Sequence, residues 1–308
     1  MKQKYLLSIT LVFFINFSSY AQDDFETWPL SFDTSDSGIS INQESSIVYQ
    51  GKYSASVQVN TSSQGSTDWR KNINLTSGVT YTVSFRIYNT EGNVKTRIYA
   101  GGYRNYSDND LTGSWQTLTY DFTPSSTGTY DIGLRFYDTS GFDGSEVVYV
   151  DDFKVSVNWT GSSSSDWDSV NNWNGGSLPS SIDNIYITSG LSNYPTTTTA
   201  VTVNSVIMET GSSLIAGSTF TGTVTYNRTL ATTNWYLVSS PVVGETYDNA
   251  YVTANSIASG TQNTNSRGIA PYVTTDDSWD YMLAGETATF TAGNGYSVKR
   301  SATGDISF

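Results

Sequence analysis

The sequence predicts an all-β protein, an antiparallel jelly-roll β-sandwich followed by a second all-β domain. Apolar and polar residues alternate over short segments, as in Tyr81 to Ile87 and Ile132 to Phe136, so the apolar side chains share one sheet face. Turn signals that contain glycine separate these segments, and no stretch shows a convincing helical period. This combination is typical of two packed antiparallel sheets.

The strands of the first half follow one another at short intervals. About eight strands in about 130 residues is the density expected of a jelly roll. The turn signals are Thr76-Ser77-Gly78, Glu91-Gly92-Asn93, Thr112-Gly113-Ser114 and Ser126-Thr127-Gly128. The alternating segments contain Ala55, Val57 and Val59; Tyr81 to Ile87; Leu118, Tyr120 and Phe122; Ile132 to Phe136; and Val148 and Val150.

The composition changes near Asn158, after which Thr, Ser, Asn and Gly dominate. Trp159, Trp167 and Trp173 follow at once, and such large apolar side chains need a core or a partner. Further strands are expected over residues 185–187, 201–206, 224–226 and 235–238, for which a solenoid is one expected form. We therefore predict a jelly-roll domain over residues 22–157 and a second all-β domain over residues 158–308.

The N-terminal residues predict export. Lys2 and Lys4 precede an apolar run from Leu6 to Phe17, and small residues end at Ala21, so residues 1–21 have the pattern of a secretory signal peptide. No later segment is apolar for long enough to span a bilayer. We expect a secreted, extracellular protein. The last residues lie inside an apparent strand, so we also expect the chain to be truncated at its C-terminus.

Missing residue types and net charge exclude several functions. The chain has no cysteine and no histidine, which removes disulfides, the usual zinc ligands and the serine or cysteine triads that need a histidine base. Its formal net charge of −13 argues against binding to nucleic acid or to anionic membranes.

Three segments repeat one pattern of arginine, an apolar residue and tyrosine. They are Arg86-Ile87-Tyr88, Arg97-Ile98-Tyr99 and Arg135-Phe136-Tyr137. Alternation along a strand predicts that each Arg and Tyr point outward together, and phenol rings beside guanidinium groups suit hydroxyl-rich or acidic sugars. The alternative is that these are ordinary solvent-facing positions, where cross-strand pairs stabilise the sheet without binding a ligand.

Several loose motifs follow one another between about Asp24 and Val157. They are Asp24-Phe25-Glu26, Gly51-Lys52-Tyr53-Ser54-Ala55, Trp69 ahead of Leu75, Ser77 to Phe85, Trp115 before a strand, and Val148-Tyr149-Val150-Asp151-Asp152-Phe153. By the order and spacing of these motifs, the stretch resembles the secreted jelly-roll carbohydrate-binding modules of families four, nine and twenty-two.

The resemblance implies a structural calcium ion between the first and last strands. Glu26 and Asp151 would supply hard carboxylate oxygens, and backbone carbonyls near Lys52 would complete the shell. The alternative is that Asp151 and its neighbour Asp152 only cap a strand end in solvent.

The resemblance also implies that a sugar chain lies on a sheet face or across loop ends, clamped by aromatic rings. By position, Trp69 is the best stacking candidate, and an arginine-rich face would favour uronic or sulfated polysaccharides. The same arginines could instead pair with Asp68, Asp121 or Asp138. The further candidates are Arg97, Tyr99 and Tyr137, with Tyr103 or Phe142 on adjoining loops, and Arg86, Tyr88 and Arg135 from the repeated pattern.

The second half contains a series of short motifs. They are Trp159-Thr160-Gly161, Asp166-Trp167, Asn172-Trp173, Leu178-Pro179, Asp183-Asn184-Ile185, Tyr194-Pro195, Gly211 to Leu214, Tyr226-Asn227-Arg228 and Trp235 to Pro241. With these motifs, the second half resembles a segment common in large secreted proteins of gliding and polymer-degrading Bacteroidetes. Longer relatives of that kind end in a sorting domain for type IX secretion, which implies cell-surface attachment through a C-terminal region that this sequence does not contain.

These observations favour a secreted, non-catalytic, calcium-stabilised module that targets a larger protein to polysaccharide. No catalytic residue is predicted, because glycoside hydrolysis needs two carboxyl groups at a set separation and the glutamates lie scattered without a recognisable motif. One alternative is the accessory front end of a glycoside hydrolase or polysaccharide lyase. Another is a cell-surface adhesin that uses the tryptophan-rich second half.

Overall fold

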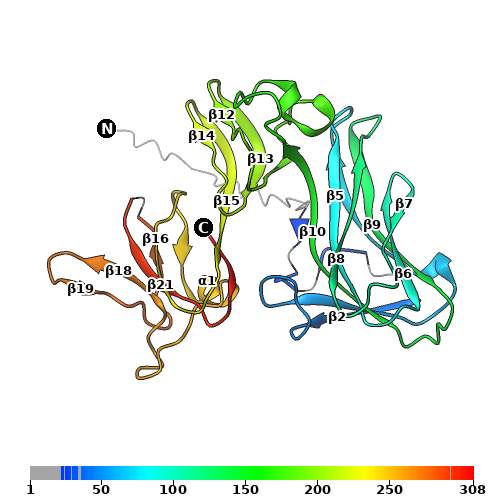
Figure 1. The fold of residues 1–308 in the computed structure, drawn as a ribbon, viewed down its shortest axis with the longest axis horizontal. Helices are drawn as coiled ribbons and strands as arrows, with labels where there is room; N and C mark the ends of the chain where they lie inside the picture. Colours follow the sequence, from blue (N-terminus) through cyan, green and yellow to red (C-terminus); the bar gives the residue numbers. More distant parts are fainter. Residues whose placement is uncertain (1–21, 24, 29, 34–35, 292) are drawn as a thin grey trace, which may run out of the picture.

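A computed structural model describes residues 22–23, 25–28, 30–33, 36–291 and 293–308 of the chain (Figure 1). Strands make up nearly all of its regular structure, so the predicted all-β class is confirmed. The described residues contain one α-helix, α1 (Asn249–Ala254), and three 3₁₀ turns, η1 (Gln64–Ser66), η2 (Val170–Asn172) and η3 (Asn174–Gly176). The predicted signal peptide, residues 1–21, lies outside the described residues.

The first half is a sandwich of two antiparallel sheets, as predicted (Figure 1). In the sheet that we call the back sheet, β10 lies in the middle and the small strand β1 also pairs with it. The back sheet has the order β2 (Ile39–Glu44), β3 (Ser54–Val59), β10 (Val147–Trp159), β5 (Tyr81–Asn89) and β8 (Trp115–Phe122), with β1 (Gln22–Asp23). The front sheet has the order β4 (Asp68–Leu75), β9 (Gly128–Asp138), β6 (Val94–Ala100) and β7 (Tyr103–Tyr106).

Strict alternation builds the core between the two sheets. In β5 every second residue from Tyr81 to Asn89 is buried, and β6 alternates in the same way. Burying the apolar side of each strand supplies the main driving force for packing the sheets together. The largest buried side chains include Trp69, Phe85 and Phe136.

Parallel strands continue the back sheet beyond the sandwich. The last residues of β10 pair in parallel with β11, which pairs in parallel with β13, and β13 pairs with β15. A second small parallel pair, β12 with β14, lies between them in the chain, so this segment coils as a short solenoid. The bounds are β11 (Asn184–Ile187), β12 (Thr196–Thr197), β13 (Val201–Met208), β14 (Ile215–Ala216) and β15 (Phe220–Leu230).

Three tryptophans join the sandwich to the solenoid. Trp159, Trp167 and Trp173 are all buried, and their ring centroids lie 4.7 to 6.3 Å apart. They belong to the same apolar core as the sandwich. Strand β10 therefore crosses the domain boundary predicted after Val157 without a break in the sheet or the core.

The C-terminal part has a separate small core. Its buried side chains include Tyr251, Phe290 and Val298, and they form a cluster separate from the sandwich core. Strands β16, β18 and β21 of this part lie away from the sandwich strands (Figure 1). Within the described residues, no helix is long and apolar enough to cross a membrane. The remaining strands are β16 (Trp235–Val238), β17 (Thr246–Tyr247), β18 (Ile269–Val273), β19 (Ser278–Trp279), β20 (Ala288–Thr289), β21 (Tyr296–Lys299) and β22 (Gly304–Ser307).

Candidate functional site

The structure separates the three arginine and tyrosine pairs that the repeated pattern grouped on one face. Arg97 with Tyr99 lies on β6 and Arg135 with Tyr137 on β9, both in the front sheet. Arg86 lies on β5, which pairs with β8 and β10 in the back sheet. The prediction that all three pairs face outward together is therefore wrong for Arg86 and Tyr88. Alternation fixes which way a side chain points, but strand pairing decides which sheet it belongs to.

Two pairs and their neighbours form what we call the arginine-tyrosine face, the outer surface of the front sheet. In one row across the strands, Asp68 is opposite Arg135, which is opposite Arg97. In the next row, Arg70 and Tyr99 flank Gly133. The face consists of Asp68, Arg70, Arg97, Tyr99, Tyr103, Tyr106, Arg135 and Tyr137.

Gly133 makes the second row compact. A Cβ atom at this position would lie 2.6 Å from the Cα of Arg70 and closer still to the carbonyl oxygen of Trp69, so no larger residue fits. Across Gly133, the guanidinium of Arg70 lies over the ring of Tyr99, 3.6 Å from its centroid. Such stacking of a cation on an aromatic ring is attractive. The contact between Arg70 and Tyr99 thus links β4 to β6 across β9, which lies between them.

Asp68 holds two of the arginines. Its carboxylate accepts a hydrogen bond of 2.7 Å from Nε of Arg135, a second from Nη2 of the same guanidinium, and one of 2.6 Å from Nη2 of Arg70. These hydrogen bonds raise the pKa of Arg135 above its usual range. Tyr103 lies against the same carboxylate, and burial, followed by the charge of Asp68, raises its pKa. The hydrogen bonds hold these side chains in one fixed arrangement.

Arg97 is held differently. Its Nε donates to the carbonyl of Arg104 at 2.6 Å, and Nη1 donates to the hydroxyl of Tyr106 at 3.1 Å. Its guanidinium also lies 4.4 Å from the ring centroid of Tyr106. Within the part of the chain that the structure describes, no carboxylate pairs with Arg97. This guanidinium therefore keeps its positive charge uncompensated at the surface.

Tyrosine rings cover the rest of the face. Tyr99 and Tyr103 meet edge to face with centroids 5.0 Å apart, and Tyr106 and Tyr137 do the same at 5.4 Å. Tyr106 is the most open of them, with 46% of its surface exposed. Aromatic rings beside fixed hydrogen-bond donors are the usual lining of a site for polar ligands with apolar C–H faces.

Trp69 and Phe142 have structural positions. Trp69 is fully buried and packs against Phe32, with ring centroids 4.6 Å apart. Its predicted role in stacking on a sugar is therefore wrong. The alternation of β4 places Asp68 and Arg70 outside and Trp69 inside. Phe142 is half-buried and packs against the same core, so the structure does not support its predicted ligand contact.

Glu26 and Asp151 converge on the loop between β2 and β3. Glu26 Oε1 accepts hydrogen bonds from the backbone N–H groups of Lys52 and Tyr53 at 2.7 and 2.9 Å. Asp151 is buried, and its Oδ2 accepts from the N–H of Tyr49 at 2.9 Å. Burial raises the pKa of Asp151 to about 8. This arrangement excludes the alternative that Asp151 only caps a strand end in solvent.

These residues fit a calcium site in part. Glu26 and Asp151 are hard oxygen donors, and within the described residues no cationic side chain pairs with Asp151. Lys52, however, meets Glu26 through its N–H, which cannot ligate a cation. The described residues contain no group of three or more acidic side chains placed to hold a metal ion. The calcium ion remains a prediction.

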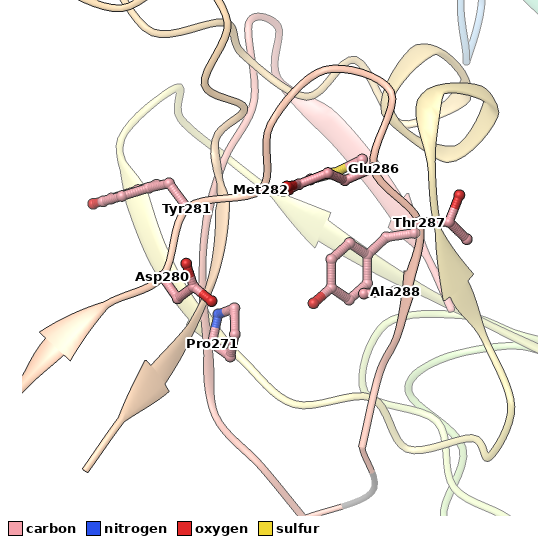
Figure 2. Close-up of a pocket in the computed structure, with 8 residues that line it drawn as sticks. Pro271, Asp280, Tyr281, Met282, Glu286, Thr287 and Ala288 are labelled. Atoms are coloured by element: carbon pink, nitrogen blue, oxygen red, sulfur yellow. The ribbon is translucent and has the colours of Figure 1, made fainter. Parts of the chain in front are cut away.

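Two cavities of the C-terminal half lie away from every predicted site residue. A groove of about 1090 Å³ lies beside the solenoid and is lined by Phe220, Tyr226 and Val243 among others. A pocket of about 290 Å³, shown in Figure 2, contains the carboxyl groups of Asp280 and Glu286. The Glu286 carboxylate accepts the N–H of Leu283 at 2.6 Å and so closes its own turn. This hydrogen bond gives the Glu286 carboxylate a structural role, so its position in the pocket needs no catalytic explanation.

Sequence reasoning missed three members of the arginine-tyrosine face as binding residues. Asp68 was considered only as an ion-pair partner, whereas it is the centre of the hydrogen-bond network. The sequence patterns do not single out Arg70 or Tyr106 as ligand residues. The alternation in β4, with Asp68, Arg70 and Asn72 on the side opposite Trp69 and Ile73, could have identified Arg70.

A family model described as a carbohydrate binding domain matches residues 11–141. This match contains every residue of the arginine-tyrosine face. The matched part of the chain is thus similar to carbohydrate-binding modules, in agreement with the family that the sequence motifs resemble. Among curated proteins, none matches the chain.

Several solved structures are similar to the sandwich. One is the C-terminal family 22 carbohydrate-binding module of Clostridium thermocellum Xyn10B, with 17% identity, a TM-score of 0.34, and 45% of this chain and 92% of that chain covered. Another is TmCBM61 in complex with β-1,4-galactotriose, with 18% identity, a TM-score of 0.30, and 40% and 85% covered. The fold assignment itself rests on the strand pairing described above.

Proposed function

We propose that the sandwich is a non-catalytic polysaccharide-binding module whose ligand lies on the arginine-tyrosine face. The match of residues 11–141 to a carbohydrate binding domain supports the ligand class. The arrangement of rings and fixed donors on the front sheet supports the place of binding.

The proposed ligand is an acidic polysaccharide. The observation that carries this choice is Arg97, whose guanidinium has carbonyl and phenol partners but no carboxylate partner among the described residues. Arg70 and Arg135 share the carboxylate of Asp68, Arg70 also lies 4.0 Å from the exposed carboxylate of Asp131, and Arg97 contacts neither carboxylate. In a chain with a net charge of −13, this local positive charge favours carboxylate or sulfate groups.

The module would act outside the cell as the targeting part of a larger protein. A binding module raises the effective concentration of a tethered partner on its polymer without doing chemistry. Cell-surface attachment through a further C-terminal region remains part of this proposal. The adhesin alternative loses its main support, because Trp159, Trp167 and Trp173 are buried and offer no adhesive surface.

We also propose that calcium holds the loop between β2 and β3 through Glu26 and Asp151. The buried Asp151 carboxylate, which has no cationic partner in the described residues, supports this. Addition of a chelator is expected to lower the melting temperature, and added calcium to restore it. The double variant Glu26→Gln, Asp151→Asn should not respond to either. A melting temperature that ignores both reagents in the native protein would contradict the calcium site.

Affinity electrophoresis of the full chain tests the ligand class. We expect polygalacturonate or alginate to retard the protein, and Arg97→Gln to weaken this binding about tenfold, because it removes one charge-assisted hydrogen bond. Arg267→Gln is the matched control, since Arg267 donates to backbone carbonyls of its own turn in the C-terminal half. Equal retardation of Arg97→Gln and native protein would overturn the proposal that this face binds the polymer.

A further inference from the structure

The outer surface of the back sheet carries a second set of aromatic rings. Trp115 in β8 is opposite Tyr88 in β5, which is opposite Tyr149 in β10. Their ring centroids are 5.5 and 5.9 Å apart, and we call these three residues the aromatic row. The same register continues to Ser56 in β3 and Asn42 in β2, which add a hydroxyl and an amide beside the rings.

Tyr49, from the loop between β2 and β3, extends the aromatic row. Its ring centroid lies 5.9 Å from that of Trp115, and 39% of its surface is exposed. The guanidinium of Arg86 stacks on the Tyr49 ring at 4.2 Å, and Asp151 accepts the Tyr49 N–H at 2.9 Å. The extension is therefore held in place by both its ring and its backbone.

The polar atoms of these rings make no hydrogen bonds to other described residues. In the described residues, neither the hydroxyl groups of Tyr49, Tyr88 and Tyr149 nor the indole N–H of Trp115 has a hydrogen-bond partner within the protein. The T-shaped contacts between rings would stabilise the sheet by themselves. They do not account for four accessible hydrogen-bonding groups gathered along one row, which a hydroxyl-rich ligand would use.

The charge beside the aromatic row is balanced. The only guanidinium described against its rings is that of Arg86, and its Nε lies 3.9 Å from Oδ2 of Asp152. Lys154 also reaches Asp152, at 2.8 Å. A second carboxylate acts on the row, because burial, followed by the charge of Glu44, raises the pKa of Tyr149. This differs from the arginine-tyrosine face, where Arg97 has no carboxylate partner among the described residues. The row therefore offers no net attraction to an anion, and its rings and hydroxyl groups favour a neutral ligand.

We propose that the aromatic row is a second carbohydrate-binding surface, which takes a neutral polysaccharide lying across the strands of the back sheet. The proposal rests on the proposed function for its class of ligand, but it uses the opposite sheet and none of the same residues. Neighbouring strands are about 4.8 Å apart, so the row spans about 10 Å over three strands. The sandwich would then hold an acidic chain on one side and a neutral chain on the other.

Calorimetry with xylohexaose and β-1,4-galactotriose tests this second surface on the full chain. Trp115→Ala is expected to weaken binding of the neutral oligosaccharide about tenfold, because stacking and an indole donor are lost. Trp235→Ala is the matched control, since Trp235 is 47% exposed and lies in the C-terminal part. Arg97→Gln should leave neutral binding unchanged. Circular dichroism and the unfolding midpoint of each variant establish that it is folded.

The outcomes distinguish binding at the aromatic row from binding at the arginine-tyrosine face. Weaker neutral binding in folded Trp115→Ala, with native binding in Trp235→Ala and Arg97→Gln, supports the second surface. Neutral binding that is lost in Arg97→Gln, or unchanged in Trp115→Ala, overturns it. If polygalacturonate binds through Arg97 and neither neutral oligosaccharide binds, this inference fails and the proposed function stands. If neither class binds, both fail.

Discussion

The two outer faces of the sandwich use the same residue types in opposite ways. On the front sheet, the guanidinium groups of Arg70 and Arg135 bind Asp68, and Arg97 remains without a carboxylate partner among the described residues. On the back sheet, Arg86 and Lys154 lie near the carboxylate of Asp152, and Glu44 adds a second negative charge. The neighbouring phenol groups have no hydrogen-bond partner among the described residues. A pattern of arginine, an apolar residue and tyrosine therefore has no fixed chemistry of its own. The residues on neighbouring strands decide whether charge or aromatic surface is presented.

The largest expected effect comes from the core that supports both faces. Trp69→Ala removes a fully buried ring that packs against Phe32, and we expect it to lower the free energy of unfolding by about 3–5 kcal/mol. Binding at both faces should weaken together. Urea denaturation measures the loss, with exposed Trp235→Ala as the control, which should change stability by less than about 1 kcal/mol. A stable Trp69→Ala variant that loses only sugar binding would restore Trp69 as a ligand contact.

The second prediction acts on the front sheet alone. Asp68→Asn removes the negative charge that Arg70 and Arg135 share. We expect the free energy of unfolding to fall by about 2 kcal/mol, because the lost hydrogen bonds are charge-assisted, although solvent partly screens these half-buried groups. The matched control is Asp131→Asn. Asp131 is 53% exposed and 4.0 Å from Arg70, so less than about 0.5 kcal/mol is expected. Equal losses in the two variants would remove Asp68 from the centre of the network.

A third variant separates backbone packing from charge. Gly133→Ala places a Cβ atom 2.6 Å from the Cα of Arg70, and we expect a loss of about 1–3 kcal/mol because backbone must move. Gly128→Ala, at the start of the same strand, meets no atom within 4 Å and is the control. Thermal unfolding compares the two. If Gly133→Ala is as stable as Gly128→Ala, the close approach of β9 to β4 is not a constraint on the front sheet.

The smallest expected effect is a difference in salt dependence between the faces. Raising sodium chloride from about 0.1 M to about 1 M shortens the Debye length from about 10 Å to about 3 Å. Binding of polygalacturonate should weaken several-fold, whereas binding of xylohexaose at the aromatic row should change by less than about twofold. Parallel titrations at both salt concentrations measure this. Equal sensitivity of the two ligands would mean that the faces do not differ in charge as described.

Much of the fold could be predicted from particular residues. The alternation from Tyr81 to Ile87 predicted a half-buried strand, and β5 buries every second residue there. The need of Trp159, Trp167 and Trp173 for a core or a partner was also correct, because all three are buried against one another. These features depend on local periodicity and on the large apolar surface of single side chains, both of which the sequence contains directly.

The candidate site was harder to predict because its members meet only through pairing. Arg86 and Arg97 have the same neighbours in sequence, yet one belongs to the back sheet and the other to the front. Resemblance by position predicts a surface ring at Trp69, but it does not say which side of β4 faces the core, and Trp69 lies on the buried side. Asp68 became important only when β9 placed Arg135 opposite it.

The sequence by itself determined the all-β class, most strand positions and the outward direction of Arg97, Tyr99, Arg135 and Tyr137, because side chains alternate with a period of two along any strand. The tertiary structure alone decided which strands are neighbours. That choice depends on burial summed over residues far apart in the chain, which no local pattern encodes. It separated Arg86 from Arg97, gave Asp68 its two arginines, and produced two faces of different charge on one sandwich.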